Sequence, residues 1–163
     1  MTRAVSIVTR EGEFVARFSE HGLVALDFPG RAPRPKATSQ AGPAPPRRWP
    51  QLAARALRSV LAGKKPASLP PLDWRGATEF QQSVWRALQR IPPGQTLTYT
   101  QLATAAGRPR AVRAAGGACG ANPIPVLVPC HRVVAASGKL GGFSGGLDWK
   151  RLLLTRENAA PRA

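Results

Sequence analysis

The sequence predicts a mixed α/β fold of the α+β class, in which a short sheet-containing part precedes a mainly helical part. Two observations support this prediction. Two β-prone segments, 14–18 and 23–28, flank the turn-like tetrad Ser-Glu-His-Gly near the N-terminus. From residue 52 onward, apolar residues recur at the spacing of amphipathic helices. A chain of 163 residues has room for one core, with or without a small subdomain.

The charge of the chain indicates its kind of partner. It carries 24 Lys and Arg against 8 Asp and Glu, for a formal charge of +16, and 19 of the 24 are arginine, whose planar fork suits phosphate. This excess favours a polyanionic partner, with nucleic acid ahead of an anionic membrane surface. Because no signal peptide, no apolar run of bilayer length and no CxxC pair is evident, we expect a cytoplasmic protein with reduced thiols.

Two domains are predicted, 1–72 and 73–163. The first combines the hairpin with a helix over 52–61. Within this domain, a linker over 29–50 joins the hairpin to the helix. It contains seven prolines, five Lys or Arg and no acid, a composition that predicts no regular structure. A second, shorter proline-containing link follows the helix and leads into the second domain.

The second domain begins with three predicted helices. Thr78-Glu-Phe-Gln81 is a capping box that starts the first helix, and Pro92 stops it. The second helix covers 99–106, and the third covers 110–119 after a glycine turn. Helix, turn and helix at this spacing resemble a helix-turn-helix, although many helical hairpins share the pattern.

The third of these helices has an unusual content. Its residues are mostly Ala and Gly, with Arg110 and Arg113 projecting. Each of two mid-helix glycines costs about 1 kcal/mol relative to alanine, so some gain must offset them. One interpretation is close packing against another helix. The other is that a thin helix lies deep in a nucleic-acid groove while arginine reaches past it.

Cys130 is the candidate nucleophile. Pro129 lacks a backbone N–H and biases Val128 to an extended conformation, so the chain should turn sharply at the cysteine. The thiolate is the reactive form of cysteine, and a neighbouring His131 or arginine lowers the thiol pKa. The alternative is a buried, inert thiol that packs as a small hydrophobe.

A glycine-rich loop and a last helix follow. Gly141-Gly-Phe-Ser-Gly-Gly146 is too rich in glycine to hold its shape unaided. It is either a flexible loop or a backbone that approaches a ligand closely. Residues 147–156 are predicted to form the final helix.

Taken together, an ordered set of motifs between about Thr78 and Glu157 resembles the O6-alkylguanine-DNA alkyltransferase family. The set contains a tyrosine, an arginine, Asn-Pro, Pro-Cys-His-Arg, Ser-Gly-Gly and a glutamate, in that order. The resemblance implies an N-terminal domain of ribonuclease-H-like type, here short. It also implies a C-terminal domain with a helix-turn-helix of the winged-helix-like kind.

The resemblance implies direct DNA repair. The alkyl group of O6-alkylguanine would pass irreversibly to Cys130 after base flipping, once per protein molecule, with O4-alkylthymine open as a second substrate. The implied catalytic residues are Cys130, His131 as its base, Glu157 as the partner of His131, Tyr99 as proton donor to the leaving guanine, and Asn122 as a brace of the turn.

Binding residues follow from the same resemblance. The base pocket would be lined by Tyr99, Val128, Phe143, Ser144 and Gly145. DNA would be bound by Arg113, which fills the space left by the flipped nucleotide, and by Arg110, Ala111, Ala114 and Arg132. Phe143 departs from the tyrosine that the family often has, so the hydrogen bond of a hydroxyl is lost there.

No cofactor is implied. Some family members bind zinc in the N-terminal domain, but this one has only His21 there and no cysteine, so no metal site is expected. The implied partner is double-stranded DNA that contains O6-alkylguanine, with no membrane. The protein would be a monomer that can cluster cooperatively on DNA, and it would be nucleoid-associated when bound.

Other functions use the same residues differently. A non-catalytic helix-turn-helix protein that binds DNA or senses damage would not need Cys130, so Cys130→Ala would leave its function intact. A cysteine hydrolase would turn over an ester, and the charge of +16 disfavours a small-molecule cleft. A redox pair of Cys119 and Cys130 has no support from their spacing, because a helix and a turn eleven residues apart give no reason to expect bonding distance.

Overall fold

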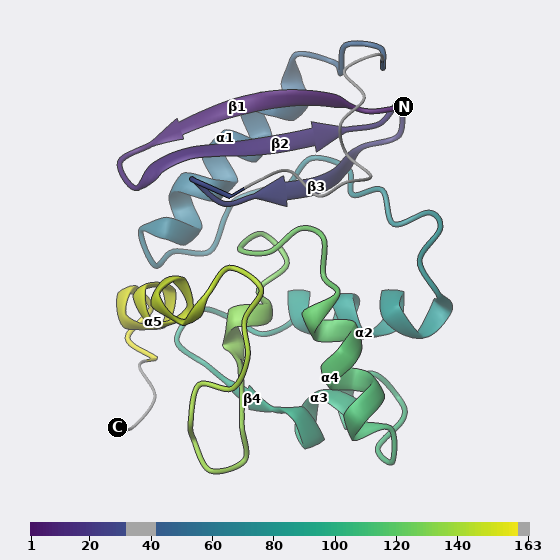
Figure 1. Cartoon of the computed structure of the whole chain (residues 1–163), viewed down its shortest axis with the longest axis vertical. Coiled ribbons are helices and arrows are strands. Elements are labelled where there is room, and N and C mark those ends of the chain that lie inside the picture. Colours follow the sequence, from purple (N-terminus) through teal and green to yellow (C-terminus); the bar gives the residue numbers. More distant parts are fainter. Residues whose placement is uncertain (32–41, 160–163) are drawn as a thin grey trace.

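The computed structural model describes residues 1–31 and 42–159. The N-terminal half forms an antiparallel sheet in the order β1 (Arg3–Thr9), β2 (Gly12–Phe18) and β3 (Leu23–Asp27). Helix α1 (Arg48–Leu61) lies along one face of this sheet (Figure 1). Buried apolar side chains of β2, β3 and α1 fill the space between sheet and helix, because each element has one apolar face to remove from water.

The predicted hairpin is confirmed, and the strand before it was missed. β2 and β3 pair antiparallel with Ala16 opposite Leu26, while β1 pairs with the other edge of β2, with Ile7 opposite Phe14. Along β1 the side chain of Ile7 is buried, whereas that of Val8 is exposed. An edge strand needs only one apolar face. The charged residues around this alternation kept β1 from being recognised as a strand in the sequence.

Helix α1 begins earlier than the sequence indicated. The prediction of no regular structure over 29–50 is wrong at its end, since the helix already includes Arg48, Trp49 and Pro50. A proline is tolerated in the first helical turn, where its missing N–H has no partner to lose. Trp49 stacks on Phe18 of the sheet, with ring centroids 6.5 Å apart. The central part of the predicted linker, 32–41, lies outside the described residues.

The C-terminal half is mainly helical, as predicted. It consists of α2 (Glu79–Gln89), α3 (Tyr99–Ala105), α4 (Val112–Gly120), a 3₁₀ turn (Cys130–Arg132) and α5 (Leu147–Arg156), with a two-stranded parallel sheet of β4 (Leu97–Thr98) and β5 (Val133–Val134). The capping box at Thr78 is confirmed, because its hydroxyl accepts from the Gln81 amide and the Gln81 side chain accepts from the Thr78 amide. None of the described helices is long and apolar enough to cross a membrane.

Helices α2, α3 and α4 pack against one another. The indole of Trp85 on α2 donates a hydrogen bond of 2.8 Å to the carbonyl of Ala118 on α4, which fixes the two helices in register. Helix α4 begins at Val112, with Ala111 as its N-cap, so Arg110 precedes the helix rather than projecting from it. This corrects the predicted start of the helix at residue 110.

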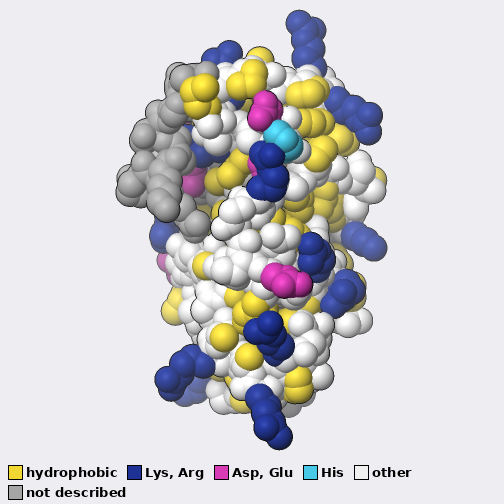
Figure 2. Space-filling view, turned by 90° about the vertical axis from the view of Figure 1, so that its right-hand side faces the viewer, with side chains coloured by type: hydrophobic (Ala, Val, Ile, Leu, Met, Phe, Trp, Pro, Cys, Tyr) yellow, Lys and Arg dark blue, Asp and Glu magenta, His cyan; other side chains and the backbone are white. Residues whose placement is uncertain are grey.

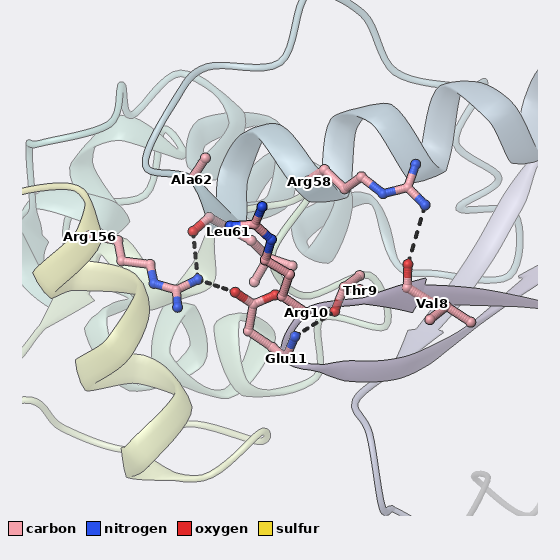
Figure 3. A pocket seen from close by; sticks show the side chains of 8 residues that line it. All are labelled: Val8, Thr9, Arg10, Glu11, Arg58, Leu61, Ala62 and Arg156. Carbon is pink, nitrogen blue, oxygen red and sulfur yellow. Dashed lines mark hydrogen bonds and ion pairs between the residues drawn. The ribbon is translucent and has the colours of Figure 1, made fainter.

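Helix α5 joins the two halves. Its Trp149 packs on Phe14 of β2 and on Phe28, which directly follows β3, with ring centroids 5.4 and 5.1 Å away. At its C-terminal end Arg156 pairs with Glu11 in the β1–β2 turn and donates a 2.9 Å hydrogen bond to the carbonyl of Leu61 on α1 (Figure 3). The hydrophobic core is continuous across both halves. The last helix is therefore held from the N-terminal side near both of its ends.

Candidate active site

A small cavity opens at the predicted nucleophile. Its volume is about 160 Å³, and residues from four parts of the chain line it: Tyr99 on α3, Gly116, Cys119 and Gly120 on α4, Cys130 in the 3₁₀ turn, and Gly142, Phe143 and Ser144 in the glycine-rich loop. A cavity of about 780 Å³ lies between the β1–β2 turn and the ends of α1 and α5 (Figure 3). Its lining contains neither cysteine nor histidine, so the smaller cavity is the candidate active site.

The turn at Cys130 is braced by Asn122. The Asn122 Nδ2 donates a hydrogen bond of 2.8 Å to the Val128 carbonyl, and its Oδ1 accepts one of 3.0 Å from the Ile124 amide. Val126 between them has φ of 74°, a left-handed conformation that costs a β-branched residue roughly 1–3 kcal/mol. The buried amide of Asn122 offsets this strain and forces the chain to turn just before the cysteine, as the proline predicted.

His131, Glu157 and Arg132 form a buried cluster behind the thiol. The His131 Nε2 lies 2.9 Å from Glu157 Oε1, although the two residues are 26 apart in sequence. The Arg132 guanidinium donates to both carboxylate oxygens of Glu157, at 2.8 and 3.0 Å, and to the Ile91 carbonyl at 2.6 Å. All three side chains are at most 5% exposed. The C-terminal end of α5 therefore delivers a carboxylate to the turn that carries the cysteine.

This cluster fixes the protonation of His131. Burial alone would raise the pKa of Glu157, but hydrogen bonds from His131 and Arg132 outweigh it and lower the pKa to about 2. Burial lowers the pKa of His131, and its bond to Glu157 offsets this only in part. The imidazole is therefore neutral near pH 7. Because a carboxylate can only accept, Nε2 carries the proton and Nδ1 is left as an acceptor.

The Nδ1 atom of His131 is buried and has no hydrogen-bond partner among the residues that the structure describes. Glu157 does not hold the ring as an imidazolium, because the Arg132 guanidinium already neutralises the carboxylate. A neutral imidazole with an unpaired Nδ1 is arranged to accept a proton, which is the role that the sequence predicted for His131.

Tyr99 and Cys119 complete the walls of the cavity. Burial raises the pKa of Tyr99, with a further contribution from the two nearby thiols, so its hydroxyl stays protonated at neutral pH. Burial likewise raises the pKa of Cys119 to about 12. The Cys119 Sγ lies 3.9 Å from the Cys130 carbonyl oxygen. Sequence spacing gave no reason to expect the two cysteines together, and the structure brings them into one cavity.

Lys150 was missed from the sequence and lies beside this cavity. Its side chain is fully buried, and Nζ donates to the Val133 carbonyl at 2.6 Å and to the Gly142 carbonyl at 3.1 Å. Burial lowers its pKa, while the two cysteines act in the opposite direction. A signal was present, because Lys150, Leu153, Leu154 and Glu157 recur at the spacing of one helical face. A lysine in such a stripe should have been examined as a buried cation.

The expected base-pocket residues divide into two groups. Tyr99, Phe143 and Ser144 line the cavity, whereas Val128 and Gly145 do not. Val128 is fully buried, and its carbonyl is used by Asn122. Gly145 is buried on the outer side of the loop, where its carbonyl accepts from Arg31. Both positions therefore shape the cavity without lining it.

The expected DNA-binding residues also divide. Arg110, Arg113 and Ala114 are exposed and Ala111 is half-buried, whereas Arg132 is 5% exposed and paired with Glu157. Assigning Arg132 to the DNA surface is contradicted by this burial, because its donors are occupied inside the protein. Lys and Arg side chains project over the full height of the face in Figure 2, including the level of α2, α3 and α4.

Known proteins share this arrangement. The family model "6-O-methylguanine DNA methyltransferase, DNA binding domain" matches residues 79–159. The methylated-DNA–protein-cysteine methyltransferase of Mycolicibacterium paratuberculosis is 58% identical over 86 residues, which are 53% of this chain and 52% of that protein. The protein of the same name from Methanosarcina acetivorans is 48% identical over 107 residues, 66% of this chain and 68% of that protein. The chain thus spans about half to two thirds of the length of these relatives.

A solved structure extends the likeness to the whole chain. The crystal structure of Mycobacterium tuberculosis OGT in complex with DNA has a TM-score of 0.77 and 36% sequence identity, and the match covers 98% of this chain and 95% of that one. The N-terminal sheet and α1 are therefore shared along with the helical half.

Proposed function

The chain belongs to the 6-O-methylguanine DNA methyltransferase family, and on that premise we propose that it repairs DNA by moving the alkyl group from O6 of an alkylated guanine to its own Cys130. The observation that carries this proposal is the buried His131–Glu157–Arg132 cluster behind a cysteine that lines a small cavity. A thiol placed only for packing has no need of a histidine next to it in the chain that is buried with one ring nitrogen unpaired among the described residues.

Thiol activation is the first step. The His131 Nδ1, directly or through one water, takes the proton of Cys130, and Glu157 stabilises the positive charge that develops on the ring. The ammonium of Lys150 favours the thiolate by its charge, since Lys150 and Cys130 act on each other electrostatically. Cys119 stays protonated because its pKa is about 12, so only one of the two thiols in the cavity reacts.

Alkyl transfer is an in-line displacement at saturated carbon. A lone pair of the Cys130 sulfur forms the S–C bond while the C–O6 bond breaks, and the electron pair of that bond leaves with guanine. The Tyr99 hydroxyl, protonated at neutral pH, donates a proton to the departing base. The thioether that forms is not hydrolysed, so each molecule reacts once. O4-alkylthymine presents the same kind of carbon–oxygen bond and is a second substrate to test.

DNA is held by α3 and α4 as a helix-turn-helix of the winged-helix-like kind. The exposed side of α4 consists of Arg113, Ala114, Gly117 and Gly120, so its backbone can lie close to the floor of a groove. Arg113 fills the space that the flipped nucleotide leaves, at an unstacking cost of a few kcal/mol. Arg110 and Ala111 contact the phosphate backbone from the turn before α4. Phe143 packs on the flipped base, and Ser144 lies at its edge.

Several coarser features belong to the same proposal. A boundary near Leu72 separates a ribonuclease-H-like N-terminal domain (1–72) from the DNA-binding and alkyltransferase domain (73–163). The protein acts as a monomer that can cluster on DNA, and it works in the cytoplasm at the nucleoid. No cofactor takes part, because the displacement needs only a thiolate, a base and a proton donor.

Intact-mass measurement after incubation with an O6-methylguanine duplex tests the proposal. One methyl group should be added per molecule, located on Cys130 and not on Cys119. Cys130→Ala should gain no mass while still binding duplex DNA, and Cys119→Ala should react as the wild type does. Multiple turnovers per molecule, or an unmodified wild type that binds the lesion tightly, would contradict the proposal. The second result would indicate a non-catalytic damage-sensing protein.

A further inference from the structure

The end of the N-terminal sheet touches the glycine-rich loop of the active site. Arg31, four residues after β3, reaches the loop with both terminal nitrogens of its guanidinium. Its Nη1 donates to the Ser144 carbonyl at 2.7 Å, and its Nη2 donates to the Gly145 carbonyl at 2.8 Å. One planar fork thus holds two consecutive carbonyls of a loop that otherwise has few side chains to fix it.

Phe28 supports the same loop. Its ring lies edge-on to Phe143, with centroids 5.7 Å apart, and also packs on Trp149 of α5. Gly145 is wedged between the two rings, because a Cβ there would lie 2.6 Å from Phe28 and 2.8 Å from Phe143. Only glycine lets the main chain pass at this point. Three features therefore join the N-terminal half to the glycine-rich loop: the Arg31 guanidinium, the Phe28–Phe143 ring pair and the close approach of the backbone at Gly145.

The loop is held from the opposite side as well. Lys150 donates to the Gly142 carbonyl from inside the protein, while Arg31 pulls on Ser144 and Gly145 from outside. Phe143 lies between these attachments and, together with Ser144, forms one wall of the cavity in front of Cys130. The position of that wall depends on both attachments. The plain flexible loop that the glycines allowed is thus replaced by a loop tied at two ends.

We propose that Arg31 is a positioning residue, through which the N-terminal half sets the width of the base pocket. This inference rests on the proposed function and deepens it, since it assigns to the N-terminal half a part in substrate binding. Arg31 touches neither the reacting sulfur nor the His131–Glu157–Arg132 cluster. Its loss should therefore weaken retention of the base and leave the rate of the displacement, once the base is bound, nearly unchanged.

The test uses full-length protein and the free base O6-benzylguanine, which separates the pocket from DNA binding. Rates of Cys130 modification are measured over a range of base concentrations for the wild type, Arg31→Ala, Arg31→Lys and Arg10→Ala. Arg10 is a matched control, because it is an exposed arginine of the same half with no contact to the loop. Arg31→Lys keeps the charge but cannot form the two-pronged contact.

A positioning role predicts a split between the two kinetic constants. Arg31→Ala should raise the concentration for half-maximal rate by about three- to tenfold, as expected for one exposed and one partly buried hydrogen bond from a charged group. Its limiting rate and the pH profile of that rate should match the wild type. The half-saturating concentration of Arg31→Lys should lie between those of the wild type and Arg31→Ala, and Arg10→Ala should behave as the wild type. Equal half-saturation in Arg31→Ala and Arg10→Ala, or a slower limiting rate alone, would overturn the inference.

Amide hydrogen exchange provides a readout that does not depend on alkyl transfer. Exchange over 143–146 should be faster in Arg31→Ala than in Arg10→Ala, with the rest of the chain unchanged. Unchanged exchange in the loop would refute the contact in solution. A wild type that never gains mass would instead refute the proposed function, and the exchange comparison would still decide whether Arg31 holds the loop.

Discussion

Glu157→Gln tests the buried cluster most directly, because the loss of folding free energy that it should cause can be worked out from the structure. The carboxylate accepts three hydrogen bonds, and its side chain is fully buried. Its pKa of about 2 lies well below the ordinary value of 4.5. At about 1.36 kcal/mol per unit, the charged form contributes about 3 kcal/mol to folding. Removing one partner of a buried ion pair typically costs about 3–5 kcal/mol, in agreement.

The sign of the pH dependence follows from the lowered pKa. The contribution of Glu157 is complete above its ordinary pKa of 4.5 and is lost as the pH falls toward the folded value of about 2. Urea unfolding at neutral pH should therefore show Glu157→Gln less stable by about 3 kcal/mol. The difference from wild type should shrink over that acid range. Glu13→Gln, at an exposed position of β2, is the matched control and should change stability little.

Reactivity should change along with stability. Glu157 raises the pKa of His131 against the effect of burial, so its loss makes the imidazole a weaker base. Alkyl transfer to folded Glu157→Gln should slow by about tenfold or more, with the thiol reacting only at higher pH, while affinity for undamaged duplex is retained. The assay is the rate of reaction with O6-benzylguanine against pH. Profiles that superimpose on wild type, with equal stability, would leave Glu157 without either role.

Two further predictions concern DNA and the buried cation. Arg113→Ala should slow repair of a saturating duplex by about tenfold but leave the reaction with O6-benzylguanine unchanged. Arg151→Ala on α5 is the control. Equal losses on both substrates would exclude Arg113 from base flipping. Lys150→Met keeps much of the volume but removes the charge, so it should slow transfer by about tenfold and shift the thiol profile to higher pH, measured by single-turnover kinetics. An unshifted profile would restrict Lys150 to holding the loop.

Much of the fold was accessible from local signals. The capping box at Thr78, the glycine turn before α4 and the β-prone segment 14–18 each depend on residues close in sequence, and the structure follows them. β1 and the start of α1 were missed because an edge strand and a helix with proline in its first turn are stabilised by partners elsewhere. Trp49 is helical because Phe18 accepts its ring, which no local pattern records.

The candidate site shows the same division. Cys130 was identified from the chemistry of its neighbours, and the contact between His131 and Glu157 required the family resemblance, because nothing local joins residues 26 apart. Arg132 was placed on the wrong side of the chain. In a 3₁₀ turn consecutive side chains do not alternate as in a strand, so its guanidinium could turn inward to Glu157. Charge alone cannot distinguish a DNA-facing arginine from one committed to a buried carboxylate.

The exposed side of α4 has a consequence for how the protein would find its substrate. Apart from Arg113, it presents only Ala114, Gly117 and Gly120, none of which can read the edge of a base. If this side lies in the groove as proposed, every intact base-pair step offers nearly the same energy. Diffusion along the duplex then meets a smooth profile, and the attraction of the phosphates keeps the protein on the DNA without stopping it at particular sequences. The search time would be set by ionic strength and by how often a base opens, rather than by pauses at intact sites.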